Sequence, residues 1–216
     1  MAIKIDNVKK AGKIKIDTII RNLEKRNMKG YYAEDREEAL RMLLEMIPEG
    51  SSVGKGGSAT LDEVGITGIL AEGNYEYLDA FGNPDPDVAK AVKRKTFSAD
   101  VFITSTNAVT MDGKLVNIDG TGNRMAAFIW GPDKVIVVAG RNKIVADEDE
   151  AVERIRCDAC PPNCLRLSKK TPCSATGVCG ECLSPGNTIC CHTVTTRFSS
   201  INDRIHVILV NEVLGF

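Results

Sequence analysis

The most reactive side chains of this chain are eight cysteines, all of them between Cys157 and Cys191. Two thiolates that are two residues apart can bind one metal ion, and four thiolates can hold zinc or an iron–sulfur cluster. Such pairs occur twice in the series, which reads Cys157-x2-Cys160-x3-Cys164-x8-Cys173-x5-Cys179-x2-Cys182-x7-Cys190-Cys191. We therefore expect residues 157–191, the Cys-rich segment, to hold an iron–sulfur cluster or structural zinc, with disulfides or free thiols as the alternative.

The composition limits the partners of the chain. Its 216 residues include 28 Lys and Arg and 29 Asp and Glu, a formal net charge of −1. A balanced chain has no overall field that attracts nucleic acid, so we expect no nucleic-acid partner. We also expect no membrane span and no signal peptide, because the sequence has no uncharged apolar run of about 18 residues and no apolar run at its start. These observations indicate a cytoplasmic protein, where clustered reduced thiols favour metal over disulfides.

A glycine turn, residues 53–60, precedes a helix-like stretch. Glycines can expose consecutive backbone N–H groups, and together with a helix start they suit a phosphate or carboxylate. The turn matches neither the Walker nor the dinucleotide-binding fingerprint, so a tight turn with a capped helix is the alternative. The residues expected to bind the ligand are Gly54, Lys55, Gly56, Gly57, Ser58 and Thr60.

Two polar loops, residues 106–113 and 117–124, follow a predicted buried strand. In open α/β sheets, the loops after the carboxyl ends of strands form the ligand crevice. Asp119 is a candidate base, and so is Glu63 near the glycine turn, although a solvated helix surface also explains Glu63. Arg124 can bind a carboxylate or phosphate with two hydrogen bonds. If these loops are more than Asx-turns and caps, the ligand-binding residues are Asn107, Thr110, Asn117, Gly122, Asn123 and Arg124.

The elements that position these residues follow from the hydrophobic pattern. Helical spacing of apolar residues predicts helices over residues 7–26, 34–47, 60–64, 85–95, 122–130 and 147–155. Compact apolar runs predict strands over residues 28–33, 51–53, 75–81, 101–104, 135–138 and 206–210, with a hairpin within 109–118. The runs are continuous, as in parallel strands buried on both faces. We predict an α/β fold: a mostly parallel open sheet with helices on both faces, N-terminal helices, and the Cys-rich segment before the last strand.

The chain divides into four predicted parts. These are an N-terminal helical part (1–48), an α/β core (49–156), the Cys-rich insertion (157–191) and a final strand region (192–216) that returns to the core. Because the cysteines lie apart from the polar loops in sequence, we expect two functional regions. Trp130 is expected in the core, His206 in a structural role, and His192 on the surface or in packing rather than on a metal.

Four runs of the sequence carry a family resemblance: GGSATLDEVGI, ADVFITSTNAVTMDGKLVNIDGTGNRMAAFIWGP, VIVVAGRNKIV and, in the Cys-rich segment, TPCSATGVCGECLSPGNTIC. They resemble the lactate-utilisation (LUD) domain family, the group that includes lactate-utilisation protein C. The resemblance implies a fold similar to the sugar-phosphate isomerase and CoA-transferase group. It also implies that Cys173, Cys179, Cys182 and Cys190 together bind one metal centre, a pattern seen in part of the family. A 4Fe–4S cluster is favoured over zinc. The other four cysteines are additions to this pattern.

The resemblance implies a component of lactate oxidation to pyruvate that binds a small anionic ligand and works beside iron–sulfur or electron-transfer proteins. The sequence shows no flavin or nicotinamide motif, so we do not expect this chain alone to perform the full redox step. One alternative is a stand-alone isomerase- or CoA-transferase-like enzyme on a phosphorylated or CoA-linked substrate, with Asp119 or Glu63 as base. Another is a thiol-based redox or regulatory module.

Overall fold

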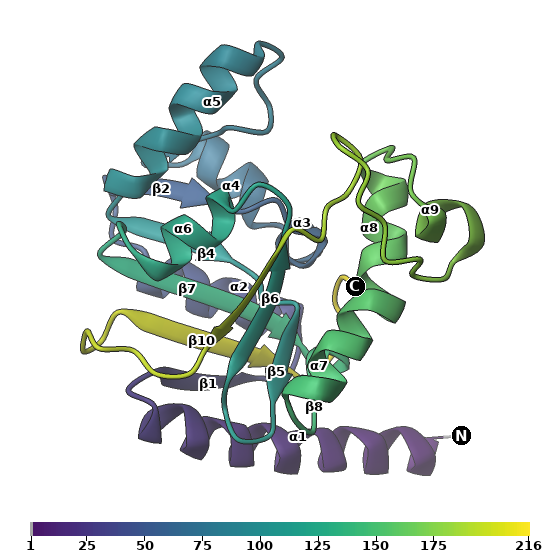
Figure 1. Ribbon diagram of the computed structural model, residues 1–216. Coiled ribbons are helices and arrows are strands. Elements are labelled where there is room, and N and C mark those ends of the chain that lie inside the picture. Colours follow the sequence, from purple (N-terminus) through teal and green to yellow (C-terminus); the bar gives the residue numbers. More distant parts are fainter. Residues whose placement is uncertain (1) are drawn as a thin grey trace.

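The main sheet is built from six parallel strands in the order β1-β10-β7-β4-β2-β3 (Figure 1). The computed structural model describes residues 2–216, with side chains from residue 7 onwards. The all-parallel pairing confirms the predicted α/β class with a mostly parallel open sheet. The strands are Lys29–Ala33 (β1), Ser52–Lys55 (β2), Glu76–Leu78 (β3), Val101–Thr104 (β4), Lys134–Gly140 (β7) and Ile205–Val210 (β10).

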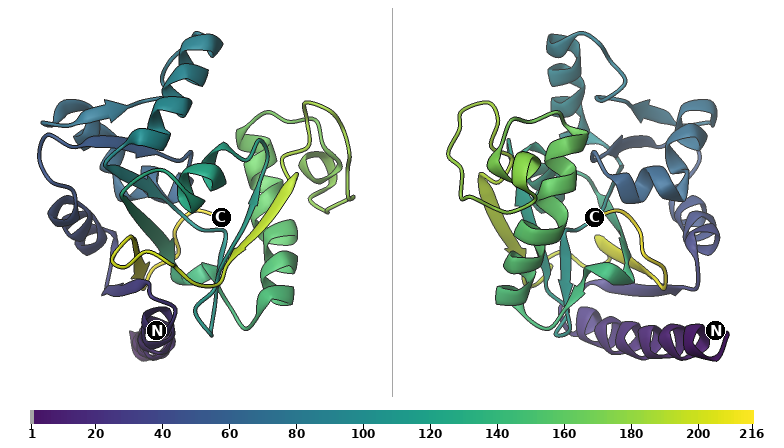
Figure 2. Two further views of the ribbon diagram at one scale, coloured as in Figure 1. Left: turned by 60° about the vertical axis from the view of Figure 1, so that its left-hand side comes forward. Right: turned by 90° about the vertical axis from the view of Figure 1, so that its right-hand side faces the viewer.

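Helices pack on both faces of the main sheet (Figure 2). On one face α1 and α6 pack against a set that includes Val135 and Val137, and on the other α2, α3 and α4 pack against a set with Ile136 and Val138. Both faces of β7 are thus buried, which explains its continuous apolar sequence. The helices up to the end of the core are Ala2–Lys25 (α1), Arg36–Met46 (α2), Ala59–Val64 (α3), Ile66–Glu72 (α4), Pro86–Lys95 (α5) and Asn123–Ile129 (α6).

A second, small sheet lies beside the main sheet, and its strand order is β8-β5-β6-β9. Strands β5 and β6 form the hairpin that Asp112-Gly113 predicts, and Gly113 adopts the left-handed conformation (φ +85°) that glycine tolerates best. Strand β9 pairs with β6 and so returns the chain from the Cys-rich segment to the core. The sequence predicted the hairpin but neither β8 nor β9. The strands of this sheet are Ala108–Thr110 (β5), Leu115–Asp119 (β6), Ile144–Val145 (β8) and His192–Thr196 (β9).

The Cys-rich segment continues a helix that begins in the core. Glu148–Arg154 (α7), a π-helical turn at Ile155–Ala159 and Cys160–Arg166 (α8) follow one another without a break, and Pro172–Thr176 (α9) comes after a loop (Figure 1). The sequence predicted the end of a helix near residue 155. The chain instead tolerates the two prolines after Cys160 because they occupy the first turn of α8, where proline suits the backbone.

Two predictions about single positions need correction. Trp130 is 76% exposed at the end of α6, not part of the core. Gly54 and Lys55 belong to β2 rather than to the glycine turn, and a Cβ atom at Gly54 would lie 2.3 Å from the Thr96 side chain. The close approach of Thr96 explains a glycine inside a buried strand. None of the helices in residues 2–216 combines the length and apolar character needed to cross a membrane.

Candidate functional site

A cavity of about 670 Å³, the site cavity, lies at the carboxyl ends of β2 and β4. One wall comes from the core and contains residues 57–60, 104–107 and 118–121. The opposite wall comes from the Cys-rich segment and includes Asn163, Arg166, Lys169, Thr188 and Cys191. The glycine turn, the polar loops and the Cys-rich segment therefore share one site instead of forming two separate regions.

About half of the residues predicted to bind a ligand line this cavity. Gly57, Ser58 and Thr60 do so, as do Asn107, Asp119, Asn123 and Arg124. Ser58 also caps α3, because its Oγ accepts a hydrogen bond from the Leu61 N–H. The predicted binders outside the lining are Gly54, Lys55, Gly56, Thr110, Asn117 and Gly122.

Three of the predicted site residues outside the lining make structural contacts elsewhere. The Glu63 carboxylate accepts from the Gly215 backbone N–H at 3.2 and 3.1 Å, and it does not line the site cavity. Lys55 Nζ lies 2.8 Å from Oδ1 of Asp62, a residue of α3, and the two side chains form an ion pair. The Thr110 hydroxyl accepts from the Lys114 N–H and so closes the β5–β6 turn.

Arg124 is the centre of the hydrogen-bond network beneath the cavity. Each of its five N–H groups has a protein acceptor at 2.8–3.1 Å, and these acceptors belong to Ser105, Asn107, Asn117, Ile118 and Asp119. Burial lowers the pKa of Arg124, and the Asp119 carboxylate partly opposes this shift. Because every donor is engaged, Arg124 in this arrangement holds the polar loops together rather than presenting a fork to a ligand.

The other polar-loop side chains are also tied to their neighbours. Asp119 Oδ1 accepts from the Gly122 N–H at 2.7 Å while Oδ2 accepts from Arg124. Asn107 Oδ1 accepts from the Ile118 N–H, and Asn117 Oδ1 accepts from the Asn107 N–H. The Asn117 Nδ2 group is buried without a partner among the described residues. These contacts give the loops a fixed shape, as Asx-turns and caps do.

Lys143 is the site residue that the sequence analysis missed. It lies in the 3₁₀ turn Arg141–Lys143 directly after β7, is 4% exposed and lines the site cavity. Its Nζ donates to Thr60 Oγ1 at 2.8 Å and to Ser105 Oγ at 2.9 Å. The signal was a lysine next to the predicted carboxyl end of a parallel strand, the usual place of ligand contacts in such sheets.

The charge of the cavity lining is strongly unbalanced. Five basic residues line it against one acidic residue, Asp119, whose carboxylate already pairs with Arg124. The basic residues come from α5, α6, the turn after β7 and the Cys-rich segment, and they are Lys93, Arg124, Lys143, Arg166 and Lys169. A concave surface with an excess of basic side chains favours an anionic ligand.

Four of the eight thiols of the Cys-rich segment lie in two close pairs. Cys160 Sγ is 3.2 Å from Cys190 Sγ, and Cys173 Sγ is 3.7 Å from Cys164 Sγ. The hydrogen bond between Cys160 and Cys190 lowers the pKa of Cys190 and raises that of Cys160.

The set implied by the resemblance does not converge around one centre. Two of its members, Cys173 and Cys190, pair with cysteines outside the set, and Cys182 Sγ lies 3.4 Å from the Thr188 hydroxyl. Among the described residues no three His, Cys, Asp or Glu side chains are grouped so that they could hold a metal ion. This arrangement of thiols therefore does not fit a cluster bound by Cys173, Cys179, Cys182 and Cys190.

Comparison with known proteins identifies the family of this chain. The family model described as LUD domain matches residues 16–210. The chain belongs to the LUD domain family. A crystal structure of a DUF162 family protein from Deinococcus radiodurans superposes on this LUD domain with a TM-score of 0.54 at 13% identity, covering 92% of this chain and 98% of the other. At that identity the likeness shows a shared fold.

A second solved structure, eIF2B delta from Chaetomium thermophilum, is much less similar. It covers 52% of the LUD domain chain and 49% of its own length, at 19% identity and a TM-score of 0.35. Among curated proteins, none matches the sequence significantly. The family and the fold of this LUD domain are thus established, and its ligand must be argued from the site cavity.

Proposed function

We propose that this LUD domain binds a small carboxylate or phosphate in the site cavity and serves lactate utilisation, the oxidation of lactate to pyruvate, beside iron–sulfur or electron-transfer partner proteins. The observation that carries the ligand class is the cavity lining, with five basic residues and one acidic residue. The lactate role rests on membership of the LUD domain family. Lactate and pyruvate are both small carboxylates, so the ligand class and the role agree.

The basic residues contribute in different ways. Arg124 has its donors engaged, and Lys143 has two hydroxyl acceptors. Arg166 and Lys169 lie on the wall formed by the Cys-rich segment, and Arg166 is exposed. A ligand carboxylate between the walls would therefore meet Arg166 or Lys169 from the Cys-rich segment, while the rest of the ligand faces Lys143 on the core wall.

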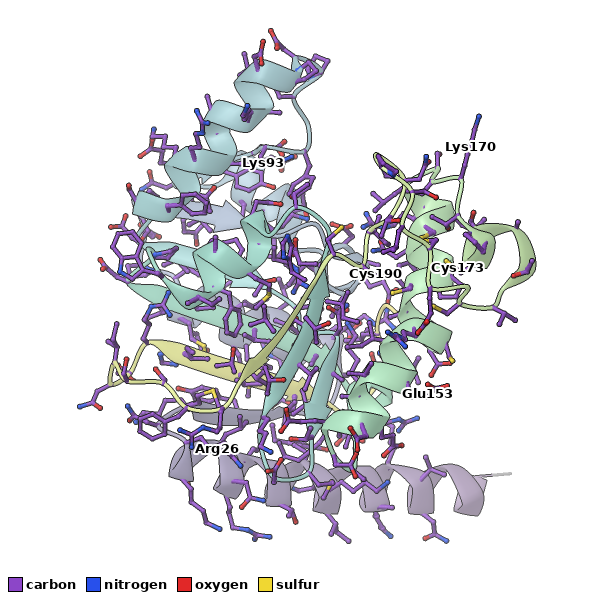
Figure 3. The ribbon with its side chains drawn as sticks, viewed as in Figure 1. Arg26, Lys93, Glu153, Lys170, Cys173 and Cys190 are labelled. Atoms are coloured by element: carbon purple, nitrogen blue, oxygen red, sulfur yellow. The ribbon has the colours of Figure 1, made fainter. Side chains whose placement is uncertain are left out.

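Calorimetric titration with lactate, pyruvate and inorganic phosphate tests this proposal. We expect Lys169→Ala to weaken anion binding roughly tenfold, the effect of one lost charge-assisted hydrogen bond. Lys170→Ala is the matched control, because Lys170 is the next residue, is exposed and points away from the main sheet (Figure 3). Equal loss in both variants, or no binding of any of the three anions to the wild-type protein, would contradict the proposal.

A thiol-based redox module is a second candidate function, and the two close sulfur pairs favour it. An iron–sulfur cluster or zinc in the Cys-rich segment is a proposal that rests on the cysteine content and on the family resemblance, not on the placement of the thiols. Both carboxylates that the isomerase- or CoA-transferase-like alternative would use as a base are engaged, because Asp119 pairs with Arg124 and Glu63 binds the Gly215 backbone.

A further inference from the structure

The amine of Lys143 has a set of contacts that suits its neutral form. The Thr60 hydroxyl donates to the Leu214 carbonyl at 3.3 Å, and the Ser105 hydroxyl donates to the Thr106 carbonyl at 3.3 Å. Both hydroxyl hydrogens are therefore committed, and both oxygens present lone pairs to Lys143 Nζ. A neutral amine has two N–H groups, and these two acceptors satisfy both.

The Nζ atom of a neutral lysine has one bond to carbon and two N–H bonds. Its lone pair occupies the fourth tetrahedral position. An ammonium group would have a third N–H there, and no acceptor for it is found among the described residues. Because Lys143 lines the site cavity, the lone pair is available to a ligand in that cavity. A buried amine with this geometry is a nucleophile.

The electrostatic surroundings of Lys143 also favour its neutral form. Burial lowers the pKa of Lys143 to about 7, with smaller contributions from the charges of Arg154 and Arg124. Glu63 is the one acid among the described residues that favours the charged form. Lys55 is the contrast, since it is also buried but forms an ion pair with the carboxylate of Asp62 at 2.8 Å.

We propose that Lys143 forms an imine with a small carbonyl compound that carries a carboxylate or phosphate group. The nitrogen lone pair attacks the carbonyl carbon, and the electrons of the C=O π bond move to oxygen. That oxygen takes up a proton as the nitrogen loses one, which gives a carbinolamine. Loss of the hydroxyl group with a second proton, as water, then forms the C=N bond, and the step needs no oxidant or reductant.

The anionic part of this substrate class follows from the basic lining of the site cavity. The inference deepens the proposed function and rests on it for the choice of a 2-oxo acid, because pyruvate carries a carbonyl group next to a carboxylate. A phosphorylated aldehyde or ketone has the same two features. The two sources are distinguished by the probes of the test.

The test is reductive trapping with sodium borohydride, which converts an imine to a stable secondary amine. The full-length protein is incubated with pyruvate, dihydroxyacetone phosphate or uncharged dihydroxyacetone, reduced, and mapped by peptide mass spectrometry. We expect an adduct with the mass of pyruvate less one oxygen atom on Lys143, none on Lys55, and at least about tenfold less adduct from dihydroxyacetone. Lys143→Arg keeps a long side chain with N–H donors but has no nucleophilic amine, and it should give no adduct.

Each outcome decides a different point. An adduct from dihydroxyacetone phosphate alone would support the nucleophile and overturn the 2-oxo acid, and equal labelling by dihydroxyacetone would overturn the anionic class. Labelling of exposed lysines without Lys143 in the wild-type protein overturns the imine, whether or not the variant folds. If an anion binds in the calorimeter but neither pyruvate nor dihydroxyacetone phosphate leaves an adduct on Lys143, the imine fails while the proposed anion binding stands. If none of lactate, pyruvate and phosphate binds and neither of these carbonyl probes labels Lys143, both fail.

Discussion

Burying the amine of Lys143 gives the protein a stability that depends on pH. The folded state holds the pKa at about 7, below the ordinary value of 10.5, mainly by burial, with Arg154 and Arg124 adding to this shift and Glu63 opposing it. Between these two values the unfolded chain binds a proton that the folded protein does not. The free energy of unfolding therefore rises with pH there, by roughly 1.4 kcal/mol for each pH unit from this one group. Below about pH 7 the full penalty of the buried charge is present.

Replacing Lys143 with Met removes this dependence while keeping a long side chain. We expect the wild-type protein to gain stability relative to Lys143→Met as pH rises from 7 towards 10, measured by urea unfolding at a series of pH values. Lys55→Met serves as the control, because Lys55 is also a buried lysine but forms an ion pair with Asp62. A constant difference between wild-type protein and Lys143→Met across this range would show that Lys143 keeps an ordinary pKa.

Single residues also show what sequence could and could not say about the site. Asn107, Asp119 and Arg124 line the site cavity, as loops that follow parallel strands and gather at one edge of a sheet would place them. Their roles were not predictable, since the five acceptors of Arg124 come from two loops whose relative position depends on the whole fold. Lys143 was missed, although it lies in the run VIVVAGRNKIV, because a lysine side chain normally points into water.

The sulfur pairs of the Cys-rich segment predict which disulfides form on oxidation. The two sulfur atoms of each pair must move about 1–2 Å closer to each other to reach the length of a disulfide bond. In metal-free protein treated with the oxidant diamide, which takes two electrons and two protons from each thiol pair, we expect Cys160–Cys190 and Cys164–Cys173 bonds. Non-reducing peptide mapping detects them, and Cys160→Ser should remove the first bond and leave the second. Bonds that join Cys179 or Cys182 to Cys173 or Cys190 would instead support the set implied by the family resemblance.

Elements of the main sheet were readable from sequence, and those of the small sheet were only partly so. Val101–Thr104 matches its prediction, and β7 and β10 contain theirs, because strands buried on both faces must be continuous apolar runs. Strand β9 has the mostly polar sequence His-Thr-Val-Thr-Thr and pairs only with β6, more than 70 residues away in the chain. Such an edge strand is specified by the partner it meets, which local pattern does not reveal.

At the scale of the whole molecule, the site cavity lies between two walls of different construction. The core wall is attached to the main sheet, where all six residues of β10 are buried. The Cys-rich wall exposes much of its apolar surface, including Leu183 (92%), Val178 (67%) and Leu165 (63%). Burial of apolar surface is the main stabilising term in folding, so the Cys-rich wall has less to hold it in place. Its connections to the core include the β9–β6 pairing, the helix that runs from α7 into α8, and the packing of Ala159 and Cys160 against Ala108 and Val116.

This difference predicts that the two walls open independently. In hydrogen–deuterium exchange of the ligand-free protein, we expect backbone amides of residues 167–191 to exchange well before those of β7 and β10, because segments with few buried apolar contacts unfold locally at low free-energy cost. Residues 160–166 should be intermediate, since α8 continues the helix from the core and buries Cys160 and Cys164. Exchange of the Cys-rich segment at the same rate as β10 would contradict this prediction and mean that the molecule unfolds as one unit. Independent opening would give a ligand its way in: the Cys-rich wall moves, and the core wall that carries Lys143 stays fixed.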